Sequence, residues 1–333
     1  AARNQRVFMD RECRIAVSRS QHGIIRVWRA SSGEFLSTLD PNIPTVTCVE
    51  MNADSTRAIS GSESGLIYLW QVDNGRCLAT PGGHSATVTS MDVSKCFQFV
   101  LTGSNDRTVK LWNMKVCECL KTYEGHGSKI SRVALDIDLN IVISGHHDGR
   151  IILWDLESAK IKADLIGHSE RIKSITISHR EQVLISGSSD GTIRVWSLDS
   201  GRCLKVLEGH TSQISHIVCA ADGQQFLSTS HDASAQVWDI ESGEVIGILK
   251  LSGDATIGAT YRERSWSVYS ANSSGILREL TLNRSATELT GAATPALSIY
   301  TNAKVVITGE TGVGKTALAS RITSNSFVPT ISS

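Results

Sequence analysis

Short apolar runs separated by polar turns recur along most of the chain. In residues 130–165, apolar runs at 130–135 and 141–143 precede a His-Asp-Gly turn, a third run covers 151–154, and a fourth begins at 160. Asp-Gly between two apolar runs is typical of a tight β-hairpin, because glycine readily adopts the positive φ that such a turn needs. The pattern therefore predicts four short antiparallel strands in each unit and no helix within the repeated region.

The unit repeats with a period of 42 residues and without insertions. One series at this period consists of tryptophans: Trp28, Trp70, Trp112, Trp154, Trp196 and Trp238. A second series carries a hydroxyl: Ser18, Ser60, Thr102, Ser144, Ser186, Ser228 and Ser270. Two further series are Gly-His pairs and aspartates: His84, His126, His168 and His210, with Asp106, Asp148, Asp190 and Asp232. A fixed period shared by several residue types predicts a repeat architecture of seven units.

This array resembles the WD-repeat family, whose repeats form the four-stranded blades of a β-propeller. The resemblance covers residues 1–291 and implies an all-β, seven-bladed propeller. It also implies a hydrogen-bonded network of the His, Ser or Thr, Asp and Trp within a blade. The complete sets are His84–Thr102–Asp106–Trp112, His126–Ser144–Asp148–Trp154, His168–Ser186–Asp190–Trp196 and His210–Ser228–Asp232–Trp238.

These sets contain the residue types of a Ser-His-Asp catalytic triad. An active site needs one copy, whereas a structural tie is needed in every blade, and four consecutive units carry the set. We therefore interpret it as structural and expect no catalytic residue in the propeller. Units 1, 2 and 7 depart from the pattern, and Leu280 replaces the tryptophan in unit 7.

Composition narrows the classes of function. The 333 residues carry 33 basic and 33 acidic side chains, and this balance argues against a nucleic-acid-binding protein. No apolar run approaches the length of a membrane span, and the first residues lack the apolar core of a signal peptide. The eight cysteines show neither a Cys-x-x-Cys pair nor a disulfide-like pattern, which favours a reducing cytoplasm and no metal in the propeller.

Residues next to the Gly-His loops and the aspartate turns should share one rim of the ring. They are Gln21, Glu63, Asn105, His147, Ser189, His231 and Ser273, with Thr45, Thr87, Lys129, Arg171 and Gln213. This set is mixed and polar, and the resemblance implies a docking face for a protein or peptide. A propeller hydrolase that uses rim histidines is the alternative, and it predicts an acidic or metal-lining cluster in the central channel.

The period ends after the seventh unit. Residues 292–303 resemble a linker, and residues 304–333 contain an apolar run at 305–307, a glycine-rich segment and a run of helix formers at 315–322. The glycine-rich segment is Gly309, Glu310, Thr311, Gly312, Val313, Gly314, Lys315 and Thr316. G-x-x-x-x-G-K-T between a strand and a helix predicts a phosphate-binding loop, with Lys315 on the β- and γ-phosphates and the Thr316 hydroxyl on Mg²⁺.

This segment is similar to the first motif of Ras-like small GTPases and to bacterial proteins that join WD repeats to a GTPase domain. The resemblance implies GTP and Mg²⁺ as cofactors, Phe327 near the guanine, and Thr330 as a second contact to Mg²⁺. A WD-repeat signalling ATPase that binds ATP, and a pure scaffold with a vestigial loop, are the alternatives.

Residues 304–333 would be only the start, one strand and one helix, of an α/β domain that needs roughly 160 residues. We therefore interpret the chain as a fragment, and GTP hydrolysis is expected only if the rest of that domain exists. The predicted function is a protein-docking scaffold coupled to a GTP-binding switch.

Overall fold

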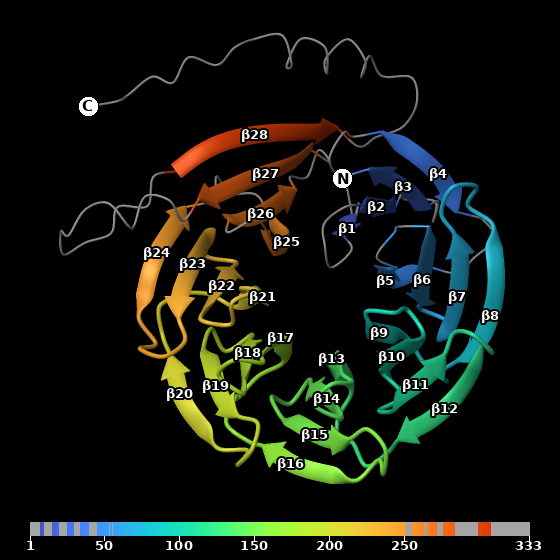
Figure 1. Ribbon diagram of the computed structural model, residues 1–333, viewed down its shortest axis with the longest axis horizontal. Helices are drawn as coiled ribbons and strands as arrows, with labels where there is room; N and C mark the ends of the chain where they lie inside the picture. Colours follow the sequence, from blue (N-terminus) through green and yellow to red (C-terminus); the bar gives the residue numbers. More distant parts are fainter. Residues whose placement is uncertain are drawn as a thin grey trace.

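The computed structural model describes residues 7–9, 15–19, 25–29, 34–39, 45–52, 54, 56–250, 255–262, 265–271, 276–283 and 299–307. In these residues the chain forms seven antiparallel sheets of four strands each, arranged in a ring (Figure 1). We number the sheets as blades 1 to 7 in chain order. The predicted all-β architecture with four strands per unit is confirmed, and the described residues contain no helix.

Each of the first four blades is built from four consecutive strands. Blade 1 contains β1 (Val7–Met9), β2 (Ile15–Arg19), β3 (Ile25–Arg29) and β4 (Phe35–Leu39). Blade 2 contains β5 (Val46–Met51), β6 (Arg57–Ser62), β7 (Leu66–Gln71) and β8 (Cys77–Gly83). Blade 3 contains β9 (Val88–Val93), β10 (Phe99–Ser104), β11 (Val109–Asn113) and β12 (Glu118–Tyr123). Blade 4 contains β13 (Ile130–Asp136), β14 (Ile141–His146), β15 (Ile151–Asp155) and β16 (Ile161–Leu165).

The remaining three blades follow the same order. Blade 5 contains β17 (Ile172–Ser178), β18 (Val183–Ser188), β19 (Ile193–Ser197) and β20 (Cys203–Leu207). Blade 6 contains β21 (Ile214–Cys219), β22 (Gln225–Ser230), β23 (Ser234–Asp239) and β24 (Val245–Lys250). Blade 7 contains β25 (Ala255–Arg262), β26 (Ser265–Ala271), β27 (Ile276–Asn283) and β28 (Ile299–Ile307). In every blade the first strand lies nearest the centre of the ring and the fourth lies on the outside (Figure 1).

The turn chemistry predicted from the sequence explains how the strands connect. Gly149 and Gly191 follow the aspartates of the second hairpin in blades 4 and 5, with φ values of 86° and 83°. A Cβ at Gly149 would lie 2.3 Å from the carbonyl oxygen of His168, so this turn requires glycine for space as well as for conformation. The tight turn of blade 4 thus packs against the loop that enters blade 5, and in blade 5 the turn places Asp190 within hydrogen-bond distance of His168 in that loop.

The hydrophobic core lies between the blades and not within any one of them. One cluster of buried residues joins Ile143 and Leu153 of blade 4 to Leu184 and Trp196 of blade 5. The other clusters bridge neighbouring blades in the same way. Because both faces of a sheet are covered by its neighbours, the middle strands β14 and β15 are buried along almost their whole length, whereas the outer strand β16 is mostly exposed. Each fully buried large aliphatic side chain contributes about 1.5–3 kcal/mol to this packing.

The blades approach so closely that one backbone position excludes a side chain. A Cβ at Gly187 of β18 would lie 2.5 Å from Cγ2 of Ile214 and 2.8 Å from Cδ1 of Ile217 in the next blade. Gly145 of β14 meets two isoleucines of blade 5 in the same manner. The glycine at this position therefore sets the spacing between neighbouring sheets.

The structure differs from the predicted domain boundary at the seventh blade. Residues 299–307 form the single strand β28, which pairs with β27 in the register Ile276↔Ile307 and Leu277↔Val306. The predicted end of the linker at residue 303 falls inside this strand, and the predicted strand of the phosphate-binding domain forms its last part. The physical reason is that β27 has an edge that needs a partner, and an apolar segment supplies it.

Two further predictions concern residues beyond these strands. The rest of the predicted linker, at 292–298, and the predicted helix at 315–322 lie outside the described residues. Among the residues that are described, no helix has the length and hydropathy to cross a membrane.

Candidate functional site

Blade 5 shows how the repeated polar residues come together. Trp196 on β19 donates its indole N–H to Oγ of Ser186 on β18, with 2.8 Å between the heavy atoms. The same oxygen lies 2.8 Å from Nε2 of His168 in the loop that enters the blade. Nδ1 of His168 lies 2.9 Å from the carboxylate of Asp190 in the second hairpin. The network therefore joins two strands, a loop and a turn.

The charge of the aspartate fixes the direction of these hydrogen bonds. Burial alone would raise the pKa of Asp190, but hydrogen bonds from His168 and Thr192 outweigh burial and hold that pKa well below its usual range. An ionised carboxylate only accepts, so Nδ1 of His168 donates to it. In that tautomer Nε2 accepts the hydroxyl proton of Ser186, whose oxygen accepts the indole N–H of Trp196. Each buried polar group thus has a partner.

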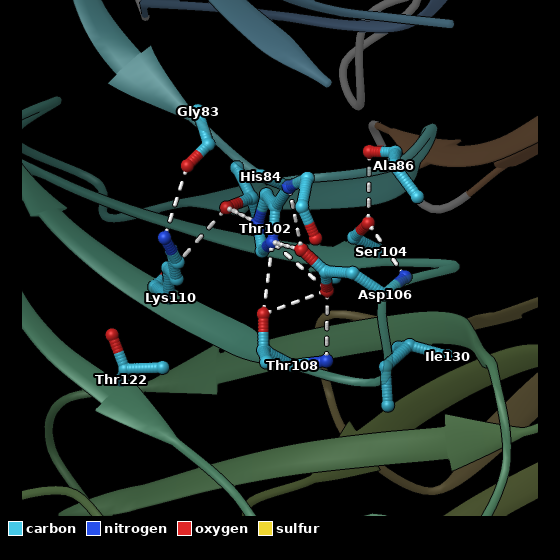
Figure 2. A network of polar contacts seen from close by, with 12 residues as sticks. Gly83, His84, Ala86, Thr102, Ser104, Asp106, Thr108, Lys110, Thr122 and Ile130 are labelled. Carbon is cyan, nitrogen blue, oxygen red and sulfur yellow. Dashed lines mark hydrogen bonds and ion pairs between the residues drawn. The ribbon is translucent and has the colours of Figure 1, made fainter. Parts of the chain in front are cut away.

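Blades 3 and 6 repeat this geometry, as predicted. In blade 3, Nε2 of His84 lies 2.8 Å from the Thr102 hydroxyl, and Nδ1 lies 3.0 Å from the Asp106 carboxylate. Figure 2 shows these residues. In blade 6, His210 lies 2.8 Å from Ser228 and 2.9 Å from Asp232. Blade 2 has the first link, a bond of 2.8 Å from Trp70 to Ser60.

Burial supports the structural interpretation of these sets. The Ser186 side chain is fully buried, and its oxygen is already bonded to an indole and an imidazole. A nucleophile needs access to substrate, and this hydroxyl has none. The network is therefore a tie that holds the loop and the hairpin against the sheet.

Blade 4 departs from the predicted set. Nδ1 of His126 lies 3.3 Å from Nε2 of His146, and Ser144 contacts both rings, at 3.4 Å and 3.1 Å. Asp148 is exposed, and it accepts a hydrogen bond of 3.3 Å from the backbone N–H of Arg150. The predicted link between His126 and Asp148 is therefore wrong, because the ring of His146 occupies the place beside His126.

The sequence holds a signal for this departure. The residue two before the aspartate is Ser104, Ser188 and Ser230 in the blades that follow the pattern. Each of these serines accepts the backbone N–H of its aspartate and so fixes the turn. His146 cannot reproduce that contact in blade 4. A comparison of this position at the 42-residue period would have separated blade 4 from its neighbours.

The rim predicted from the sequence is present as a set of adjoining pairs. The backbone N–H of the residue before the turn position, which is Ser64 in blade 2 and an aspartate in blades 3 to 6, donates to the carbonyl of a residue in the entering loop. The pairs are Glu63 with Thr45, Asn105 with Thr87, His147 with Lys129, Ser189 with Arg171, and His231 with Gln213. All ten side chains are exposed or half-buried. Gln21 and Ser273, the predicted members from blades 1 and 7, lie outside the described residues.

A groove lies on this rim between blades 5 and 6. Its volume is about 440 Å³. Its lining is mostly polar and consists of Glu170, Ser189, Asp190, Gly191, His210, Thr211, Ser212 and Gln213. The groove thus lies directly over two of the complete networks.

The predicted nucleotide and Mg²⁺ residues lie outside the described part of the chain. They are Gly309, Glu310, Thr311, Gly312, Val313, Gly314, Lys315, Thr316, Phe327 and Thr330. In the described part, no group of three or more His, Cys, Asp or Glu side chains is arranged to hold a metal ion.

Comparison with known families agrees with this geometry. The family model described as "WD domain, G-beta repeat" matches residues 33–71, 75–113, 117–155, 159–197 and 201–239, more than half of the chain. The chain belongs to the WD40 repeat family. Each matched WD40 segment combines the outer strand of one blade with the three inner strands of the next.

Solved structures support the WD40 propeller fold. The crystal structure of the computationally designed protein Ika8 is 26% identical to this chain, with a TM-score of 0.68 over 80% of each chain. No curated protein matches the chain.

The network assignment predicts a difference between two aspartates of this WD40 propeller. Asp190→Ala is expected to lower the free energy of unfolding by about 1–3 kcal/mol, because it removes the half-buried carboxylate that accepts hydrogen bonds from His168 and Thr192. Asp148→Ala is the matched control, and its expected cost is below about 0.5 kcal/mol because Asp148 is exposed. Urea denaturation measures both values. Equal losses in the two variants would contradict the assignment.

The histidine pair of blade 4 predicts an acid-sensitive stability. Burial lowers the pKa of both His126 and His146 to about 4, and His146 adds to the shift of His126. Around His146, Arg150 lowers its pKa further, whereas Asp148 and Asp164 oppose the shift. Both rings stay neutral in the folded state and take up protons in the unfolded state below pH about 6.5. Stability is therefore fully present above that pH and is lost as the pH falls towards 4.

His146→Ser tests this assignment by restoring the residue of the other blades. His126 should then bond Asp148 as His168 bonds Asp190. We expect the wild type to lose about 2–3 kcal/mol more than the variant between pH 7 and pH 4, measured by urea denaturation at each pH. Parallel curves for the two proteins would refute it.

Proposed function

We propose that this WD40 propeller is a protein-docking scaffold whose partner binds the rim formed by the Gly-His loops and the aspartate turns. The observation that carries the proposal is the set of backbone bonds that join these loops and turns in five successive blades. They form a continuous arc of solvent-accessible side chains on a backbone that does not need those side chains for its own shape.

The networks beneath the rim explain why it suits recognition. In blades 3, 5 and 6 the same network residues hold the turn, while the rim residue next to the aspartate differs and is Asn105, Ser189 or His231. The network that holds the turn is thus the same in these blades, whereas the rim side chain next to it differs from blade to blade. Recognition residues commonly lie on loops that a rigid scaffold positions in this way.

The groove between blades 5 and 6 supports a peptide-like contact. About 440 Å³ accommodates one or two side chains of a partner, and its hydroxyl and carboxylate lining offers hydrogen bonds. A docked protein would bury this groove and use the surrounding arc as the rest of its interface.

A double substitution on the rim tests the docking proposal. Lys129→Glu with Ser189→Arg changes charge and shape on blades 4 and 5 and leaves the buried networks intact. Partners that co-purify with the wild type are identified and then tested as purified proteins by calorimetry. We expect the variant to bind them at least about tenfold more weakly, a loss of about 1.4 kcal/mol.

Arg202→Glu is the control for this experiment. Arg202 is exposed in the turn between β19 and β20, at the opposite end of β19 from the rim of the same blade. It should leave the affinity unchanged. Partners that tolerate the rim variant but not Arg202→Glu would refute docking on this face.

Nucleotide binding is a second proposed function, and it rests on the motif at residues 309–316. The sequence Gly-Glu-Thr-Gly-Val-Gly-Lys-Thr favours GTP with Mg²⁺, through the contacts predicted for Lys315 and Thr316, with ATP as the alternative. A bound nucleotide would then regulate docking as a switch, in a chain that contains the rest of the domain. A scaffold with an inactive loop is the remaining alternative.

Lys315→Ala tests this second function. In a chain that extends through the whole predicted domain, the variant should lose GTP binding by at least about 100-fold, because the lysine contributes a charge-assisted contact to the phosphates. The thermal midpoint of the propeller should stay unchanged. Fluorescent GTP and ATP analogues measure the affinities, and equal binding by wild type and variant would refute the assignment.

We also propose a cytoplasmic location for this protein. Its support is the state of the cysteines, since all seven that the structure describes are free thiols. Free thiols on this scale are typical of a reducing compartment.

A further inference from the structure

The innermost strands carry two positions whose side chains normally serve the backbone. At the first, the hydroxyls of Thr47, Thr89 and Ser131 donate to glycine carbonyls of their own blades, at 3.0 Å. At the second, Ser90 and Ser174 accept backbone N–H groups of the next blade, at 3.3 Å and 2.9 Å. These contacts explain why small hydroxyl residues recur there at the 42-residue period.

Three basic residues break this rule. Lys173 of β17 occupies the first position, and Arg132 of β13 and His216 of β21 occupy the second. All three lie on the strands nearest the centre of the ring, in adjoining blades (Figure 1). In a repeat protein, a side chain that departs from the structural pattern is free to serve a ligand, and here three departures meet in one place.

The guanidinium of Arg132 is held across two blades. Its Nε donates to the carbonyl oxygen of Lys173, and Nη1 donates to the carbonyl oxygen of Ser131 at 3.1 Å. Nη2 has no hydrogen-bond partner among the residues that the structure describes. Arg132, Lys173 and His216 are each half-buried, so solvent in the channel reaches them.

The charges of this cluster repel one another. Burial, and then Arg171, lowers the pKa of Arg132 to about 10. Burial also lowers the pKa of Lys173, with Arg171 and Arg132 adding to the shift. Burial lowers the pKa of His216 to about 4, and Arg132, His231 and Lys173 lower it further.

No carboxylate of the described chain is among the groups that shift these three pKa values. Cys48 is the acidic group that does act on Arg132, but burial raises the pKa of its thiol to about 12, so it stays neutral. A nearby negative charge stabilises half-buried cationic groups that repel one another.

We infer that Arg132, Lys173 and His216 form a binding site in the central channel for a phosphate-type oxyanion that carries two or more negative charges. The planar fork of Arg132 and the ammonium of Lys173 suit such a ligand, and two cations match a dianion. His216 adds an N–H donor. The site does not depend on the docking partner of the rim or on the nucleotide motif.

Calorimetry with pyrophosphate and inorganic phosphate tests this site. The parent protein carries Lys315→Ala, so that the glycine-rich motif contributes no phosphate binding. We expect one saturable site whose Kd rises at least tenfold in Arg132→Gln and in Lys173→Gln. Arg202→Gln is the matched control, and its Kd should equal that of the parent. The absence of binding in the parent, or equal Kd values in all four proteins, would overturn the inference.

Two further measurements keep the test independent of misfolding. Without anion, Arg132→Gln should unfold close to the temperature of the parent, because removal of the repulsion offsets the loss of the two hydrogen bonds to backbone carbonyls. In the parent, pyrophosphate should raise the pKa of His216 in NMR titrations, and an unchanged pKa would overturn its place in the site. Comparison of pyrophosphate with O-phosphoserine identifies the source, since the tighter ligand shows whether a free anion or a phosphorylated side chain fits.

Discussion

The structure depends on one hydrogen-bonded chain, which runs from a tryptophan through a hydroxyl and a histidine to an aspartate. In blades 3, 5 and 6 it connects the third strand, the second strand, the entering loop and the second hairpin. Packing between blades supplies most of the stabilisation, but apolar contacts do not choose a loop conformation. The polar chain does so, because any other conformation would leave buried donors and acceptors unpaired. The rim that we propose for docking has a fixed shape for this reason.

Most of the fold could be predicted because the repeat presents the same evidence many times. The strands, the Asp-Gly turns, three of the four complete networks and the rim pairs all follow from residues at the 42-residue period. The prediction failed at His126, whose partner is set by His146, a neighbour outside the four series that were compared. The predicted domain boundary also differed from the structure at β28. The 42-residue period does not predict this strand, because it begins at residue 299, well after β27 ends at residue 283. The basic cluster at Arg132 was not predicted, since side chains from three blades meet only in the closed ring.

Departures from the repeat carry the information that the repeat itself lacks. Residues that recur from blade to blade stabilise the blade itself, so they indicate the fold but not the ligand or the partner. His146 changes the chemistry of one blade by placing a second buried histidine, whose pKa is lowered by burial, beside His126. Arg132, Lys173 and His216 replace hydroxyl-bearing or small side chains and place three basic residues on the innermost strands of adjoining blades. The departure at His146 lies within one blade, and we expect it to affect stability. The departures at Arg132, Lys173 and His216 lie in three adjoining blades, and we infer that they bind a ligand.

The strand β28 has a consequence for how the end of this chain can be used. Its hydrogen bonds to β27 complete the outer edge of the seventh blade. The phosphate-binding motif would need residues 305–307 as the first strand of a different sheet, flanked by other strands of that domain. One segment cannot satisfy both sheets at the same time. Formation of a nucleotide-binding domain and completion of the seventh blade would therefore compete for the same residues, and whichever forms first leaves the other without its strand.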